Sequence, residues 1–205
     1  MLIGFFIEPD ASVKKLIINH KRLVKKKYGD QIYLNHPPHL TILTIKLKKK
    51  LLRKDIFEIN TFVNSFKKNI ITITNTDFFY NDPQVKGNTM FFSVKKNVYL
   101  SKLQIKLVEF LKKKFGNSII KKNKFLGIMK KNHNLYGYPF IGKNWKPHFT
   151  ISSINKNKDL NLIRPYIKKK LNISFRVQKI SIWLIKKNLH QKLKTINFKW
   201  KILIL

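Results

Sequence analysis

Runs of apolar, β-branched and aromatic residues recur along the chain, and each run predicts a β-strand. Two of these runs are separated by residues 81–88, which contain Asp82-Pro83 and Gly87 and therefore predict a turn. The predicted strands cover residues 3–7, 39–45, 69–80, 88–96, 148–154, 173–187 and 193–205.

Between the strands, apolar residues three and four positions apart predict amphipathic helices. The first helix follows Ser12, a residue type that caps helices, and ends at Gly29. Two further helices are predicted over 100–115 and 158–170. Another covers 51–68, where the apolar positions are Leu52, Ile56, Ile59, Phe62, Val63 and Phe66.

Residues 117–144 show neither period, and a stretch of this length predicts a strand plus a loop over a site. The element order is therefore roughly β-α-β-α-β-β-α-β-α-β-β. No Gly/Ser-rich linker divides the chain. We expect residues 1–205 to form a single α+β domain with two lobes that are diverged structural repeats.

The charge of the chain is strongly positive, with 44 Lys and Arg against 9 Asp and Glu and a formal net charge of +35. Codon drift in an AT-rich genome would enrich Lys but would not by itself deplete Asp and Glu, so a polyanionic partner is an equal explanation. Lys acts as a point charge against a phosphate backbone, whereas Arg reads bases with two bonds. The Arg residues are only Arg22, Arg53, Arg164 and Arg176, which favours backbone binding if the partner is nucleic acid.

The composition excludes several classes of protein. Without cysteine, the chain has no disulfide, no cysteine nucleophile and no Cys-based zinc site. No apolar run is long enough to span a bilayer. The first short apolar run lacks preceding basic residues and meets Glu8 and Asp10 at once, unlike a secretory signal. We therefore expect a cytoplasmic protein that does not associate with a membrane.

One short pattern occurs twice with nearly the same neighbours. Residues 38–42 read Pro-His-Leu-Thr-Ile, and residues 147–151 read Pro-His-Phe-Thr-Ile. In a strand, residues i and i+2 point to the same face. His39 therefore shares a face with Thr41, while Leu40 points to the core, and the second copy repeats this alternation. Two such copies in a chain with six histidines indicate a site.

The residue types in the two copies suit phosphate chemistry. Two strands that each present a histidine and a hydroxyl across a cleft would hold one phosphate between them. Cleaving a phosphodiester needs a base for the attacking oxygen and an acid for the leaving oxygen. Imidazole, with an ordinary pKa of about 6.5, serves in either role near neutral pH. We therefore expect catalysis without metal or cofactor by His39, Thr41, His148 and Thr150.

These paired motifs resemble those of the 2H phosphoesterases, which include bacterial 2′-5′ RNA ligases and RNA 2′,3′-cyclic phosphodiesterases. Residues 3–10 are similar to the first strand of that family, 145–151 to the approach to its second motif, and 180–187 with 193–200 to its closing strand pair. The resemblance implies a two-lobed, pseudo-symmetric α+β fold in which antiparallel sheets line a central cleft and the helices lie outside.

The resemblance also implies an activity, namely metal-independent opening of 2′,3′-cyclic phosphates or reversible 2′-5′ ligation at RNA ends. The family pattern implies His39 as the acid for departure of the 2′-oxygen and His148 as the base, although the sequence alone does not order them. The expected partner is RNA, such as tRNA or another RNA end, or a cyclic nucleotide. We expect a monomer.

The loop before the second motif contributes candidate substrate-binding residues, namely Tyr136, Tyr138, Lys143 and Lys146. Residues 137–143 also match G-x-x-x-x-G-K, the start of a nucleotide-binding P-loop. However, Asn144 replaces the Ser or Thr that would bind magnesium, and a strand follows instead of a helix. We therefore expect a loop beside His148 and no P-loop.

The remaining histidines give weaker signals. His36 is separated from His39 by two prolines, which makes a helical metal pair implausible. His20, His133 and His190 lie among polar or basic residues, so we expect them at the surface.

Two other functions stay open on the sequence. The same fold can serve as a basic RNA-binding module whose catalysis is lost, although both motifs are intact. It can also trim RNA from the 3′-end as an exonuclease.

Overall fold

The computed structural model describes residues 1–66, 69–82, 85–120, 125–166, 170–186 and 190–198. Its strands are β1 (Leu2–Glu8), β2 (Leu40–Lys46), β3 (Ile70–Asp82), β4 (Gly87–Val94), β5 (His148–Asn155), β6 (Lys170–Arg176), β7 (Lys179–Ile185) and β8 (His190–Asn197). Its helices are α1 (Ala11–Tyr28), α2 (Arg53–Asn64), α3 (Val98–Phe115) and α4 (Gly127–Tyr136), with 3-10 turns at Gly116–Ser118, Gly142–Asn144 and Leu160–Tyr166.

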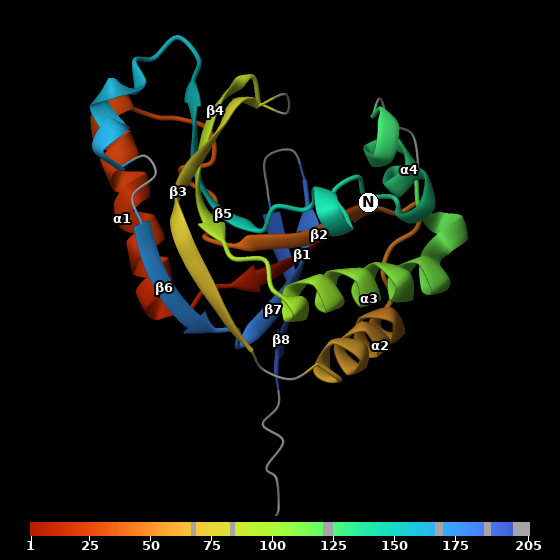
Figure 1. Cartoon of the computed structure of the whole chain (residues 1–205). Helices are drawn as coiled ribbons and strands as arrows, with labels where there is room; N and C mark the ends of the chain where they lie inside the picture. The colour runs from red at the N-terminus through yellow and green to blue at the C-terminus, as the bar shows by residue number, and fades with distance from the viewer. Residues whose placement is uncertain (67–68, 83–84, 121–124, 167–169, 187–189, 199–205) are drawn as a thin grey trace, which may run out of the picture.

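The strands form a continuous antiparallel arrangement in the order β6-β3-β4-β5-β2-β1-β7-β8. The central neighbours β2 and β5 are joined through one residue pair, Leu40 with Phe149. The sheet therefore divides into two lobes. We call β2, β1, β7 and β8 the first lobe, and β5, β4, β3 and β6 the second lobe (Figure 1).

The two lobes repeat the same plan around the β2–β5 junction. Each motif strand pairs with a strand that precedes it in the chain, β1 or β4. In both pairs the register shifts just before a phenylalanine, and that phenylalanine stands opposite the motif threonine. The pairs are Phe6 with Thr41 and Phe91 with Thr150. This correspondence confirms the predicted two-lobed, pseudo-symmetric α+β fold.

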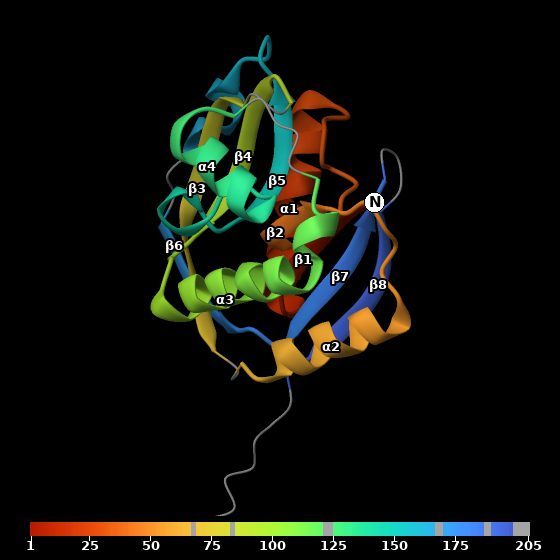
Figure 2. The same ribbon diagram turned by 90° about the vertical axis from the view of Figure 1, so that its right-hand side faces the viewer.

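The helices lie outside the sheet, and the two long ones exchange lobes. Helix α1 follows β1 in the chain but contacts β5, while α3 follows β4 but contacts β2. Figures 1 and 2 show α1 along the second lobe and α2 and α3 along the first. None of the helices in the described ranges is long and apolar enough to cross a membrane.

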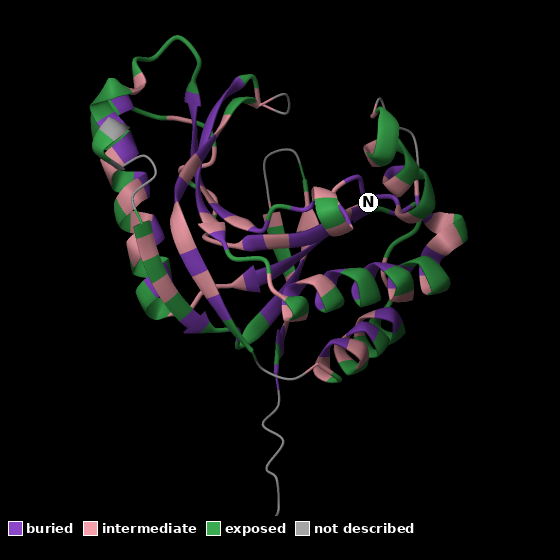
Figure 3. Cartoon of the chain, viewed as in Figure 1, coloured by how far each residue is buried: buried purple, intermediate pink, exposed green. Residues whose placement is uncertain are grey.

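The core lies between the sheet and these helices (Figure 3). It includes the inward residues of the motif strands, Leu40, Ile42, Phe149 and Ile151, all with no exposed surface. Because alternate residues of a strand face opposite sides, burial of these residues turns the motif histidines and threonines away from the core.

Most predicted elements are confirmed, but the first helix has a different cap. The Asp10 carboxylate accepts a hydrogen bond from the Val13 backbone N–H at 2.9 Å, which makes Asp10 the N-cap. Ser12 lies inside the helix and donates to the same carboxylate at 3.0 Å. The predicted end at Gly29 is confirmed, with the glycine at φ 72°.

The strand expected within 117–144 is wrong, because the described part of this stretch holds the helix α4 instead. In the described part of the stretch, the β pairing is limited to an isolated bridge between Leu47 and Ile119. Helix α4 leaves its apolar residue Ile128 54% exposed and buries the polar His133. It therefore lacks the apolar stripe by which a helix is found in a sequence.

The single strand expected over 173–187 is also wrong. Residues 177 and 178 break it into β6, which pairs with β3 of the second lobe, and β7, which pairs with β1 of the first. The helix predicted over 158–170 is the short 3-10 turn Leu160–Tyr166, which contains Pro165. Residues 199–205 of the last predicted strand lie outside the described residues.

A buried glutamine of α3 joins the motif strand β2 to the loop that precedes the second motif. The Gln104 side chain has no exposed surface. Its amide N–H groups donate to the backbone oxygens of Ile42 at 2.9 Å and Phe140 at 3.0 Å. Its oxygen accepts from the Gly142 N–H at 3.1 Å. Its amide nitrogen and its oxygen together therefore hold the 140–142 loop against β2.

Replacing Gln104 with Leu keeps the volume but leaves these backbone groups without a partner. We expect Gln104→Leu to lower the free energy of unfolding by roughly 2–3 kcal/mol, because unsatisfied buried polar groups cost about 1–3 kcal/mol each. Urea unfolding measures the change. The control is Gln178→Leu at an exposed position, expected to change stability by less than about 0.5 kcal/mol. Equal stability of the two variants would contradict this account of the loop.

Candidate active site

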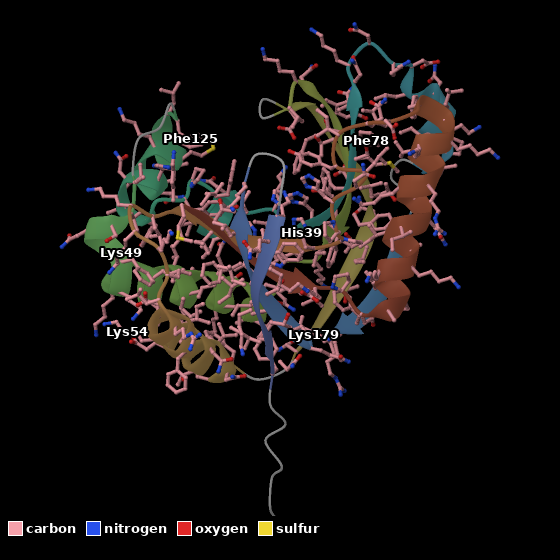
Figure 4. All side chains as sticks on the ribbon, turned by 180° about the vertical axis from the view of Figure 1, so that it is seen from behind. His39, Lys49, Lys54, Phe78, Phe125 and Lys179 are labelled. Atoms are coloured by element: carbon pink, nitrogen blue, oxygen red, sulfur yellow. The ribbon has the colours of Figure 1, made fainter. Side chains whose placement is uncertain are left out.

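The register at the β2–β5 junction brings the two motifs together. Because the strands are antiparallel about the pair Leu40–Phe149, His39 lies toward Thr150, and Thr41 lies toward His148. All four side chains line one cavity of about 770 Å³. Figure 4 shows His39 near the middle of the molecule and Phe78, which lines the same cavity, on the second lobe.

The two histidines are oriented by the same backbone contact. Nδ1 of His39 lies 2.7 Å from the backbone oxygen of Pro37, two residues earlier, and Nδ1 of His148 lies 2.7 Å from that of Lys146. A carbonyl oxygen only accepts, so Nδ1 carries the proton in both rings. Nε2 of each ring is thereby left as the atom that exchanges a proton with a ligand.

Aromatic rings hold both imidazoles from the side. His39 packs against Phe6 with ring centroids 4.4 Å apart. His148 packs against both Phe79 and Phe91, with centroids 5.2 and 5.0 Å away, and these two rings stack on each other at 4.1 Å. The two phenylalanines of the register shifts, Phe6 and Phe91, thus play equivalent parts in the two lobes and limit rotation of the rings.

The remaining predicted residues divide into two groups. Tyr138 and Lys146 line the cavity, and the Lys146 ammonium lies 5.9 Å from the centre of the Phe79 ring. Lys143 is exposed and does not line the cavity. Tyr136 does not line it either, and its ring contacts Lys112, whose Nζ lies 5.3 Å from the ring centre.

Comparison with known proteins bears on the family of the chain. The family model of the 2′-5′ RNA ligase superfamily matches residues 9–189. The chain belongs to this superfamily. Membership places it among phosphoesterases and RNA ligases. No curated protein matches the chain in sequence.

Solved structures share the fold of this superfamily member at low sequence identity. TT0787 of Thermus thermophilus superposes with a TM-score of 0.69 at 13% identity, covering 98% of this chain and 100% of its own. E. coli LigT complexed with 3′-AMP gives 0.56 at 11%, covering 97% and 98%. Kluyveromyces marxianus Usb1 gives 0.51 at 10%, covering 96% and 98%. These similarities extend over nearly the whole chain and confirm the 2H phosphoesterase fold.

The lobes of this 2′-5′ RNA ligase superfamily member are tied together close to the site. Trp145 is 4% exposed, and its indole N–H donates to the backbone oxygen of Thr41 at 3.1 Å. The bond runs from the approach to the second motif to the threonine of the first. It fixes the distance between the motif strands where their direct pairing ends.

The G-x-x-x-x-G-K segment is not built as a P-loop. Gly137 ends helix α4 at φ 75°, and Gly142 begins a 3-10 turn that leads into β5. A P-loop instead follows a strand and opens a helix. Among the described residues, no group of three or more histidines, aspartates or glutamates is arranged to hold a metal ion.

Sequence reasoning missed several cavity residues, among them Tyr33, His36, Asp82 and Thr89. The Thr89 hydroxyl donates to the Asp82 carboxylate at 2.8 Å. Asp82 lies in the stretch predicted as a turn, and no local pattern sets it apart. His36 stands in the sequence His-Pro-Pro-His, where its spacing from His39 raises only the question of a metal pair.

The surface position expected for His20, His133 and His190 is wrong for His133, and the other two are only partly exposed. His133 is buried and packs against Phe125 with ring centroids 5.5 Å apart. His20 and His190 are half-buried. His20 packs against Phe92 of β4, and His190 against His36. Polar neighbours in sequence do not reveal packing between distant segments.

The two catalytic candidates differ in their charged surroundings. Burial, together with the nearby His36, Lys21 and His190, lowers the pKa of His39 to about 4 against the raising effect of the Pro37 bond. Burial also lowers the pKa of His148, but the Lys146 bond and the carboxylate of Asp82 raise it. Basic groups therefore face His39, whereas a carboxylate faces His148.

This difference is measurable by NMR titration of the imidazoles in phosphate-free buffer. We expect His39 to stay neutral, with its proton on Nδ1, until the pH falls to about 4. Because the unfolded chain takes up this proton near pH 6.5, the free energy of unfolding should fall as the pH drops from about 6.5 towards 4. A His39 midpoint near 6.5 would contradict this electrostatic account.

Proposed function

We propose that the chain hydrolyses 2′,3′-cyclic phosphates at RNA ends by acid/base catalysis between His39 and His148. One observation carries the proposal: two pseudo-equivalent histidines line one cavity, each with Nδ1 bonded to a backbone oxygen and Nε2 left for the ligand. Membership in a superfamily of phosphoesterases and RNA ligases supports the same reaction class.

In the proposed reaction, a water attacks phosphorus and one bond from phosphorus to a ribose oxygen breaks. Nε2 of the base takes the proton of the water, and Nε2–H of the acid protonates the departing oxygen. The hydroxyls of Thr41 and Thr150 donate to the non-bridging oxygens and stabilise the charge that develops there. For ligation, a ribose hydroxyl of a second RNA end replaces the water, and the reverse reaction exchanges the two histidine roles.

The charges around the site favour one assignment of these roles. Lys21 and His36 disfavour a positive charge on His39, so this imidazole starts neutral. The neutral form is the one that a base needs to accept a proton. Asp82 supports the protonated form of His148. We therefore assign His39 as base and His148 as acid in hydrolysis, the reverse of the order that the family pattern implies.

Single alanine variants combined with two kinds of substrate test both parts of this proposal. On a 2′,3′-cyclic phosphate RNA end, without added metal, His39→Ala and His148→Ala should each lower kcat by about 10²–10⁴. On a p-nitrophenyl phosphodiester the leaving oxygen needs no proton, because p-nitrophenolate is a stable anion. Here His148→Ala should lose far less activity than His39→Ala.

The contrary outcomes are distinct from one another. If His39→Ala instead loses less activity than His148→Ala on the aryl ester, the assignment of acid and base is reversed while the proposed reaction stands. Full activity of His148→Ala on both substrates, or loss of wild-type activity on EDTA treatment, would sink the proposed chemistry. RNA binding that is sensitive to salt and indifferent to both variants, with no turnover, would instead favour the non-catalytic module.

A further inference from the structure

The pseudo-symmetry of the site exposes one feature that only the first lobe has. Three residues before the second motif histidine stands Trp145, which is buried and bonded to Thr41. Three residues before the first motif histidine stands His36, which is half-buried and lines the cavity. The equivalent position therefore holds a buried structural residue in one lobe and a residue that lines the cavity in the other.

His36 lies in a turn whose backbone oxygens are bonded by a buried lysine of α1. Lys21 of α1 is 6% exposed, and its ammonium donates to the backbone oxygens of Tyr33, Leu34 and His36, the last at 2.8 Å. Tyr33 adopts φ 72°, a left-handed conformation that is uncommon outside glycine and needs such support. The turn is thus built to present Tyr33 and His36 to the cavity.

The link between His36 and His39 is stiff. Pro37 and Pro38 fix their own φ angles and keep the residues before them extended. The oxygen of Pro37 also accepts the Nδ1–H of His39 at 2.7 Å. Since three residues span at most about 11 Å, the two imidazoles can contact groups of a single nucleotide.

A second histidine packs against His36 without lining the cavity itself. His190, the first residue of β8, meets His36 edge to face with ring centroids 4.6 Å apart. Its Nδ1 is buried and finds no hydrogen-bond partner among the described residues. The mechanism proposed above uses neither ring.

The charge of this corner suits an anion. Burial lowers the pKa of Lys21 only to about 8, so its ammonium remains largely charged at neutral pH beneath the turn. Burial, His190 and Lys21 lower the pKa of His36, because each disfavours a positive charge on that ring. A bound phosphate would accept an N–H bond from His36 and offset this repulsion.

We propose that His36, with His190 packed against its ring, forms a second anion site, which holds the phosphate on the 5′-oxygen of the nucleotide whose cyclic phosphate reacts at His39 and His148. In an RNA end of this kind, the 5′ phosphate is the next one along the strand. The site would select substrates with two phosphates over a nucleoside cyclic phosphate that has a free 5′-hydroxyl. This inference rests on the proposed function.

Three substrates with the same base test the selectivity: a nucleoside 2′,3′-cyclic phosphate with a 5′-hydroxyl, its 5′-phosphate form, and a dinucleotide with an internal phosphodiester. We expect the wild type to prefer the phosphate-bearing substrates at least about tenfold in kcat/KM, through KM. A preference for the 5′-phosphate form over the dinucleotide would identify a terminal monoester as the ligand, and the reverse order a strand.

The variants His36→Gln and His190→Gln should lower that preference towards one, mainly by raising KM for the phosphate-bearing substrates. His20→Gln is the matched control, because it removes an imidazole from α1 that does not line the cavity, and it should retain the preference. Thermal melts of each variant establish that it is folded.

The results separate the two proposals. Hydrolysis of all three substrates at equal rates would overturn the second anion site and leave the proposed function standing. A preference that survives in both His36→Gln and His190→Gln would also overturn it. Failure of folded wild-type protein to hydrolyse any of the three would refute the proposed function and this inference with it.

Discussion

The whole site depends on the backbone pairing of Leu40 with Phe149, the one pair through which the described strands β2 and β5 join. Both residues are fully buried. Their burial fixes the register of two strands that come from distant parts of the chain, and a slip by one residue would turn every motif side chain to the other face. A backbone pairing between two core residues thereby brings two histidines and two threonines together in one cavity.

Around this pairing the two motif histidines have the same backbone and aromatic contacts but differ in the charged groups near them. Both lobes bond Nδ1 to a backbone oxygen and pack a phenylalanine of the adjacent strand against the ring. The basic residues Lys21, His36 and His190 surround His39, whereas the carboxylate of Asp82 lies near His148. This difference in charge supports the separate roles that we propose for the two histidines.

Much of this arrangement was predictable from the sequence, because the decisive signals are local. The period-two pattern of 39–45 and 148–154 gave the strands and the face of each motif residue, and the repeated Pro-His-x-Thr-Ile identified the catalytic candidates. Family resemblance then supplied the topology. That His39 and His148 act as proposed is still a prediction.

The parts that were not predictable depend on contacts between distant segments. The position of His36 is determined by Lys21 and His190, and the latter lies at the other end of the chain. Residues 177 and 178 carry no glycine or proline, yet the chain changes lobes there because β6 and β7 pair with different strands. Helix α4 has a largely polar buried side, so its period is hidden.

The central claim is that the two motifs act on one phosphate, and a double-mutant cycle on kcat tests it directly. If His39 and His148 work on the same reacting phosphate, the His39→Ala/His148→Ala double variant should be about as slow as the slower single variant, because groups that act as a unit lose their effect together. Losses that multiply, so that the double variant is slower by the product of the two single effects, would show independent actions and contradict the account.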